Sequence, residues 1–102
     1  MANNRFELIV QESAAKEVLE ALVYYKGIGF QLSQRLKFEV RKSIRSIKRN
    51  PYSFQVRFDD IRLYHLQTFP YSIHFEIDID IKLVKILAFL HQNQGPGEKG
   101  EL

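Results

Sequence analysis

The sequence predicts an α+β domain in which a helical hairpin packs on one face of a small, mostly antiparallel sheet, in the order β-α-α-β-β-β. Apolar residues recur at three- and four-residue spacing over two stretches between residues 14 and 48, which is typical of amphipathic helices. Between residues 62 and 91, apolar and polar residues alternate or apolar residues run together, which indicates strands. We expect one domain over residues 1–91 and a flexible tail over residues 92–102.

The N-terminal part is expected to form the first strand and the first helix. Residues 6–10 place apolar side chains at every second position, which favours a strand. Ser13 is the expected N-cap of the helix that follows, since its hydroxyl can accept a hydrogen bond from a free N–H of the first turn. Gly27-Ile28-Gly29 should end this helix, because glycine tolerates the positive φ of a C-cap. So short a break predicts an antiparallel second helix.

The second helix should run from about Leu32 to Lys48 with one narrow apolar stripe, and Asn50-Pro51 should end it because proline disfavours helical geometry in the preceding residue. Residues 31–49 hold seven basic side chains and a single acid, Glu39. Five of the basic residues and Phe38 fall on the side opposite the apolar stripe: Arg35, Arg41, Lys42, Arg45 and Arg49. One helix therefore carries most of the positive charge.

Two interpretations of this basic face remain open. In the first, the charges are solvated and Phe38 covers an edge of the first helix, as on many charged helix surfaces. In the second, Phe38 and the five basic residues around it bind a partner, either an acidic peptide or a nucleic-acid backbone. An aromatic residue in the middle of a basic face is unusual for a merely solvated surface.

The C-terminal half is predicted to be an antiparallel meander. A strand opens at Arg62, and Phe69-Pro70 forms the next turn. Residues 71–77 alternate apolar and polar side chains, which indicates a strand with one buried face, and Asp78-Ile79-Asp80 is the turn after it. Leu83 to Leu90 is almost continuously apolar, so we expect it to be the best-buried, central strand.

Composition excludes several classes of site. The chain has no cysteine, which rules out disulfides, thiolate nucleophiles and cysteine metal sites. Neither a signal-peptide pattern nor an apolar run of the roughly 20 residues that a membrane span needs is present, so we expect a cytoplasmic protein. A glycine-rich phosphate loop and a nucleophile elbow are also missing. The net charge of +3 is modest and leaves the basic helix as the place to seek an anionic partner.

Over roughly residues 5–96, the order of elements and several short motifs resemble the RelE/ParE superfamily of small bacterial toxins. The matching motifs are Ala14-Ala15, Tyr24-Tyr25, Asn50-Pro51, Ile61-Arg62, Phe69-Pro70-Tyr71 with Ile73 and Phe75, and Ile86-Leu87-Ala88-Phe89-Leu90-His91. The Phe-Pro-Tyr turn and the terminal histidine look more like the ParE branch. The resemblance implies the toxin of a type II toxin-antitoxin, or plasmid stabilisation, system that a cognate antitoxin holds inactive. A homodimer or a toxin-antitoxin hetero-oligomer would be compatible with it.

The two branches imply different chemistry. ParE-like members are associated with poisoning DNA gyrase, which needs only a binding surface, whereas RelE-like members cleave messenger RNA on the ribosome. Cleavage needs an acid, a base and cations around the phosphate. For that case His91 is the acid/base candidate, because imidazole titrates near neutrality, and Arg62 is its catalytic partner. Arg57 and Lys85 are candidate phosphate contacts, and the two-residue strand period predicts that Lys85 shares a face with His91.

Other residues argue against catalysis or against metal binding. Ser72 and Gln94 stand where RelE/ParE relatives often carry arginine, which favours target binding over cleavage, while an inert family member remains a third possibility. His74 is expected to face solvent, and the facing of His65 is undetermined. A histidine pair joined by Glu76 lacks the usual spacing of metal ligands, so neither a metal nor a cofactor is expected. His91 itself has an alternative reading as a structural or interfacial histidine.

Overall fold

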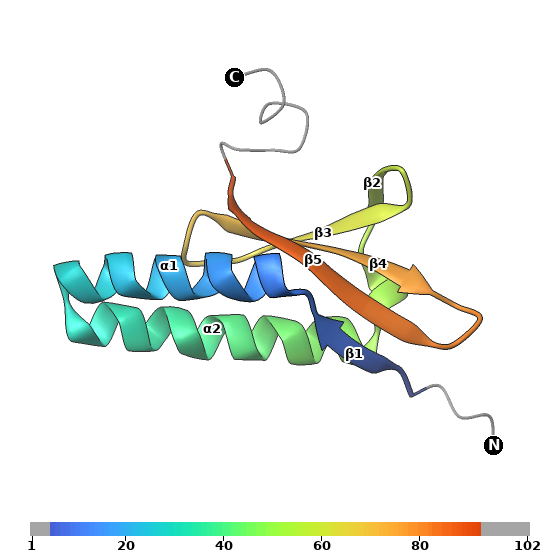
Figure 1. Cartoon of the computed structure of the whole chain (residues 1–102), viewed down its shortest axis with the longest axis horizontal. Helices are drawn as coiled ribbons and strands as arrows, with labels where there is room; N and C mark the ends of the chain where they lie inside the picture. The colour runs from blue at the N-terminus through green and yellow to red at the C-terminus, as the bar shows by residue number, and fades with distance from the viewer. Residues whose placement is uncertain (1–4, 93–102) are drawn as a thin grey trace.

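The predicted α+β class is confirmed by the computed structural model, which describes residues 5–92 (Figure 1). Its elements are β1 (Glu7–Val10), α1 (Glu12–Ile28), α2 (Phe30–Arg49), a 3-10 turn η1 (Pro51–Ser53), β2 (Val56–Phe58), β3 (Ile61–His65), β4 (Tyr71–Asp78) and β5 (Leu83–His91). The short strand β2 was not predicted. The tail expected over residues 92–102 lies outside the described residues, apart from residue 92.

The five strands form one sheet in the order β1-β5-β4-β3-β2. β1 pairs with β5 in parallel, and the other three pairings are antiparallel. The middle strand is therefore β4, and the prediction of a central β5 is wrong in this respect because β1 is the outermost strand beyond it. β5 is still an interior strand and buries Val84, Ile86, Phe89 and Leu90.

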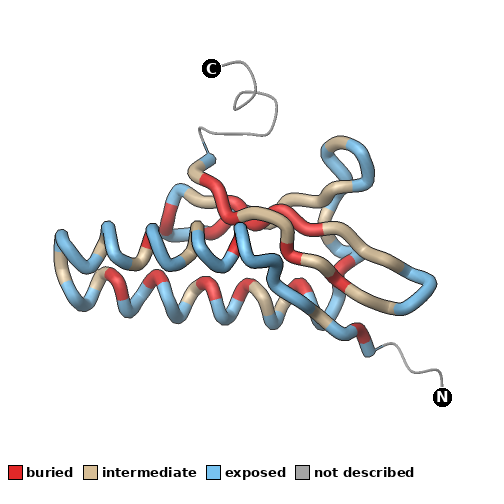
Figure 2. The backbone as a smooth tube through the Cα atoms, viewed as in Figure 1, coloured by how far each residue is buried: buried red, intermediate tan, exposed pale blue. Residues whose placement is uncertain are grey.

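The two helices run antiparallel and cover one face of the sheet, with the tip of the hairpin extending past it (Figure 1). The apolar stripe predicted for the second helix faces the core: Leu36, Val40 and Ile47 of α2 are at most 5% exposed, and Leu32 and Ile44 are partly buried (Figure 2). They share a core with Ile73, Phe75, Val84, Ile86 and Phe89 of the sheet and with Ala14 and Ala21 of α1. Each large side chain contributes roughly 1.5–3 kcal/mol through burial. This stripe fixes the rotation of α2 and so determines which side chains point outward.

Two details of the helix ends differ from prediction. α1 begins at Glu12 with Gln11 at the N-cap, and Ser13 is not the cap because its hydroxyl donates to the Leu87 carbonyl of β5 at 3.3 Å. The hairpin turns at Gly29 alone, whose φ of −173° is extended rather than positive. α2 ends directly before Asn50-Pro51, as predicted.

One turn of the sheet is formed by two aspartates, and the turn predicted at Asp78-Ile79-Asp80 begins one residue later than expected. Asp59 and Asp60 form the two-residue turn between β2 and β3, both with positive φ, 43° and 63°. Positive φ at both positions is typical of a type I′ hairpin turn, in which Asn-Gly and Asp-Gly are favoured. β4 continues through Asp78, so the turn before β5 occupies residues 79–82, one position later than predicted.

A β-bulge interrupts the pairing of β4 with β5. His74 pairs with Ala88 and Phe75 pairs with Ile86, so Leu87 is an additional residue in β5. An extra residue in one strand reverses the side to which all later side chains point relative to the two-residue period. The segment from Ala88 to His91 is therefore turned over with respect to the first half of β5.

Side chains of α1 hydrogen-bond the bulged part of β5. β1 ends opposite Ile86, so among residues 5–92 no strand pairs with the next residues of β5 on that side. Ser13 donates to the carbonyl of Leu87, and the Glu17 carboxylate accepts the Phe89 N–H at 2.9 Å. Two side chains one helical turn apart thus replace the strand partner that β5 lacks here.

Candidate partner-binding groove

A groove of about 400 Å³ lies between the outer side of α2 and the opposite wall formed by β3 and the β3–β4 loop. We call it the α2 groove; its lining residues are Gln34, Arg35, Phe38, Glu39, Lys42 and Ser43 of α2, Tyr64 of β3, and Gln67, Thr68 and Phe69 of the loop. Three of the six residues predicted to bind a partner line it: Arg35, Phe38 and Lys42. No residue of α1 lines it, so Phe38 faces the loop and not an edge of the first helix.

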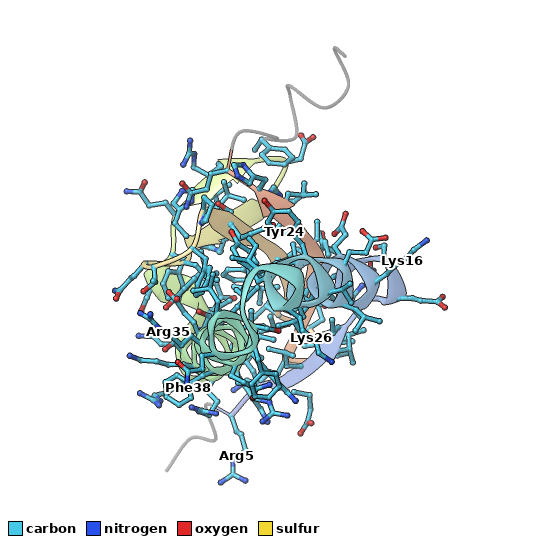
Figure 3. All side chains as sticks on the ribbon, turned by 90° about the vertical axis from the view of Figure 1, so that its left-hand side faces the viewer. Arg5, Lys16, Tyr24, Lys26, Arg35 and Phe38 are labelled. Atoms are coloured by element: carbon cyan, nitrogen blue, oxygen red, sulfur yellow. The ribbon has the colours of Figure 1, made fainter. Side chains whose placement is uncertain are left out.

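The spacing of the sequence along α2 puts these three residues on one side. Arg35, Phe38 and Lys42 follow one another at three and four residues, which aligns them along a helix. Arg45 and Arg49 continue the same line, and the whole line spans about 21 Å at 1.5 Å per residue. Phe38 is 64% exposed, and it projects on the same side of the hairpin as Arg35 (Figure 3).

The opposite wall of the groove is held in place by Glu39. Its carboxylate accepts the backbone N–H groups of Gln67 at 2.6 Å and of Thr68 at 3.1 Å. Leu66 and Phe69, on either side of this pair, are 4% and 5% exposed and anchor the loop in the core. The loop is therefore fixed relative to α2 by two charge-assisted hydrogen bonds and two buried side chains.

The groove is positively charged. Within residues 5–92, none of Arg35, Arg41, Lys42, Arg45 and Arg49 makes an ion pair, and all five are exposed. In the part of the chain that the structure describes, Glu39 is the one acid that lines the groove, and the loop N–H groups already engage its carboxylate. An exposed aromatic ring between unpaired cations is an arrangement that suits an acidic, partly apolar ligand.

Arg62 and Arg57 lie elsewhere. The Arg62 guanidinium donates to the Phe54 carbonyl at 2.5 Å and lies over the Tyr52 ring, 5.1 Å from its centroid. These contacts tie the segment after α2 to β3. Arg57 is exposed on the short strand β2, at the edge of the sheet.

His91 and Lys85 lie on opposite faces of β5, which corrects the prediction that they share one. Lys85 pairs with Glu76, and its ammonium nitrogen is 4.0 Å from the Glu76 carboxylate, on the face away from the helices. His91 pairs with Tyr71 on the helix face, with the two ring centroids 5.4 Å apart. The Leu87 bulge is the physical reason, because it shifts the two-residue period between them.

The four residues named for nuclease chemistry are not brought together. Arg62 pairs with Phe75 and His91 pairs with Tyr71, so they lie four residues apart along β4, about 13 Å, and on the strands that flank it on opposite sides. By contrast, three of the partner-binding candidates line one groove. The structure thus brings three of the six residues named for binding to one groove and separates the four named for cleavage.

The other histidines also differ from expectation. His74 is only 4% exposed, not solvent-facing, because it sits in the middle strand with Leu63 of β3 and Ala88 of β5 on either side. His65 shares a hydrogen bond with the Ser72 hydroxyl at 2.5 Å between their side chains. No group of three His, Cys, Asp or Glu side chains that could hold a metal ion occurs among residues 5–92.

Sequence reasoning missed the loop that forms the second wall of the α2 groove. One feature of the sequence could have pointed to it. Glu39 is the only acid in a segment with seven basic residues, and an isolated carboxylate of this kind suggests a fixed hydrogen-bond partner. The partner itself, a pair of backbone N–H groups 28 and 29 residues away, has no sequence signature.

Solved structures share this fold. A chain of the chromosomal ParDE toxin-antitoxin system from P. aeruginosa superposes with a TM-score of 0.76 at 15% identity, over 87% of this chain and 98% of that one. A chain of the intact E. coli RelBE toxin-antitoxin complex superposes with a TM-score of 0.56 at 17% identity, over 82% and 93%. No protein-family model and no curated protein matches the sequence.

A membrane-spanning role finds no support in the helices of residues 5–92, as neither is long and apolar enough to cross a bilayer. The element order, the two-helix hairpin on one face of the sheet and the superpositions agree with the resemblance drawn from the sequence motifs. The chain has the RelE/ParE-like toxin fold.

Proposed function

We propose that this chain is the toxin of a type II toxin-antitoxin system and that a cognate antitoxin neutralises it. The likeness to the ParDE and RelBE structures supports this proposal. The observation that carries the partner assignment is the α2 groove, where the exposed Phe38 lies between Arg35 and Lys42, two cations that make no ion pair within residues 5–92. An acidic antitoxin segment with an apolar side chain for Phe38 is its occupant.

The energetics favour Phe38 as the centre of that interface. Covering a phenylalanine that is now 64% exposed removes apolar surface from water, and central aromatic residues often cost 2 kcal/mol or more when truncated, about thirtyfold in affinity. The surrounding cations contribute mainly to the association rate and to the choice of an acidic partner. Loop and helix are already braced by Glu39, so little ordering is required on binding.

As its mode of action, we propose binding to a cytoplasmic target such as DNA gyrase rather than cleavage of messenger RNA. Cleavage would require cations that converge on an acid/base group. Arg62 is engaged by Phe54 and Tyr52, Lys85 is on the opposite face from His91, and Arg57 is at the sheet edge. A RelE-like ribosome-dependent endoribonuclease and an inert family member are the outcomes that would replace this proposal.

The first experiment measures growth after induction of the chain alone, of the chain with the product of the neighbouring gene, and of the variant His91→Ala. We expect arrest by the chain alone, rescue by the neighbour, and unchanged arrest by His91→Ala. Loss of arrest in a folded His91→Ala protein would indicate a nuclease. The absence of arrest with soluble wild-type protein would contradict the toxin assignment.

The second experiment tests the groove with two matched phenylalanines of the same helix. Phe38 in the groove is 64% exposed, and Phe30 at the hairpin tip is 61% exposed and does not line it. We expect Phe38→Ala to weaken binding of the neutralising partner at least tenfold in calorimetry, and Phe30→Ala to leave it unchanged. Arg45→Ala should reduce the association rate at low salt. Equal affinities for both phenylalanine variants would contradict the groove as the site.

A further inference from the structure

A second hollow, of about 500 Å³, lies between α1 and the ends of β4 and β5. We call it the α1 pocket; it is lined by Glu17, Glu20, Ala21 and Tyr24 of α1, Tyr71 of β4, and Phe89, Leu90 and His91 of β5. The binding proposal above does not involve this pocket. We propose that this pocket binds an arginine side chain presented by a partner polypeptide.

Aromatic rings form the sheet side of the pocket. Tyr71 and Phe89 stack with centroids 4.7 Å apart and planes 5° from parallel, and the ring of His91 stands at 70° to Tyr71. On the helix side, the small side chain of Ala21 leaves the space open, and Tyr24 forms the rim with 63% of its surface exposed. Flat aromatic surfaces of this kind attract cations, and they stack best with the planar guanidinium.

The charge of the residues that line the pocket also favours a cationic ligand such as a guanidinium group. Glu17 and Glu20 are three residues apart on α1 and so lie on one side of the helix. Among residues 5–92, no lysine or arginine lines the pocket, although the whole chain carries a net charge of +3. Glu17 is fixed against the wall by the N–H of Phe89, and Glu20 is exposed at the opening. A carboxylate at the rim can receive two guanidinium N–H groups, which a lysine ammonium cannot match in geometry.

The tyrosine in the wall stays neutral and available as a surface for stacking. Burial raises the pKa of Tyr71 above its ordinary value of 10.0, and the neighbouring Tyr25 and Tyr24 raise it further. The pocket is also separate from the α2 groove, because Tyr24 points to a different side of the hairpin from Arg35 and Phe38 (Figure 3). The inference thus does not depend on the proposed function, and each can fail alone.

The test is a titration of the ¹⁵N-labelled full chain with three capped peptides, Gly-Arg-Gly, Gly-Lys-Gly and Gly-citrulline-Gly, followed by NMR. Citrulline keeps the shape of arginine and removes its charge. We expect saturable shifts of the amides of Tyr24, Leu90 and His91 with the arginine peptide, and binding weaker by roughly tenfold with citrulline and severalfold with lysine. Equal binding of the citrulline peptide, or shifts confined to the α2 groove, would overturn the proposal.

Variants locate the site. Glu20→Gln and Tyr24→Ala change exposed residues of the lining, and we expect each to weaken binding of the arginine peptide by roughly tenfold. Glu12→Gln removes an exposed carboxylate of the same helix outside the pocket and should not alter binding. Unchanged affinity in both pocket variants would exclude the site.

Discussion

In both hollows beside the helical hairpin, a helix glutamate accepts hydrogen bonds from backbone N–H groups of the opposite wall. Glu39 of α2 accepts two from Gln67 and Thr68 in the β3–β4 loop, and Glu17 of α1 accepts one from Phe89 in β5. The surroundings of the two carboxylates differ. Cations and Phe38 surround Glu39, whereas a second carboxylate and the Tyr71–Phe89 stack accompany Glu17. In each hollow the glutamate supplies the brace, while the side chains around it determine which ligand charge the hollow suits.

The largest effect should come from removing the brace of the α1 pocket. Glu17→Ala leaves the N–H of Phe89 without its acceptor in a part-buried position, and we expect the free energy of unfolding to fall by about 1–3 kcal/mol in urea denaturation. Glu20→Ala, one helical turn away and exposed, should stay within about 0.5 kcal/mol of wild type. Equal losses in the two variants would mean that Glu17 does not act as a brace.

Removing the brace of the α2 groove should cost less. Glu39→Ala frees N–H groups of an exposed loop, which water can satisfy, so we expect a loss of about 0.5–1.5 kcal/mol. Hydrogen exchange at Gln67 and Thr68 should accelerate, while exchange at Phe89 should change only with global stability. A larger loss of stability in Glu39→Ala than in Glu17→Ala would contradict the expected order of the two braces.

A substitution outside both hollows should change the free energy of unfolding in the opposite direction, as a stabilising reference. Asp60 sits at φ 63° in the β2–β3 turn, where glycine avoids the steric cost of a side chain. We expect Asp60→Gly to raise the free energy of unfolding by about 0.5–1 kcal/mol in urea denaturation, with unchanged binding at both hollows. A change in ligand affinity would show that stability and binding are coupled. The predictions for the two hollows treat them as independent.

The smallest expected effect is on the free energy of unfolding at high pH, where a tyrosine of each hollow is compared. The pKa of Tyr71 is raised in the folded state by burial and by its tyrosine neighbours, so the unfolded chain loses this proton first as pH rises past 10.0. Unfolding therefore becomes easier above that pH until the folded state also ionises. Tyr71→Phe should remove part of this loss of stability between pH 9 and 11, and Tyr64→Phe in the α2 groove should retain it. Identical pH profiles for the two variants would contradict the role of burial at Tyr71.

Sequence reasoning succeeded where one element carried the whole signal. The outer face of α2 follows from spacings of three and four residues within a single helix, and the strand at Leu83–His91 follows from its apolar run. The reasoning failed where several elements meet. The α1 pocket draws its lining from residues 17–24, 71 and 89–91, and only the sheet order brings these together.

Short irregularities were the other cause of failure. β2 has three residues, too few for any periodicity, and it was missed. The prediction that Lys85 and His91 share one face of the strand was wrong because a period of two assumes that no residue is inserted between them. Nothing in Ile86-Leu87-Ala88 distinguishes a bulge from a regular strand.

The Leu87 bulge also makes the sidedness of the C-terminal strand a matter of one residue. If Leu87 were paired regularly instead of bulged, a continuous period would turn Phe89 and His91 to the face that Lys85 occupies and would turn Ala88 and Leu90 toward the helices. Deletion of Leu87 would instead remove the bulge without turning the strand end over, because Ile86 and Ala88 already pair with the consecutive residues Phe75 and His74. The aromatic stack therefore stays on the helix side with or without this residue, and only regular pairing of a retained Leu87 would move it to the other side of the protein.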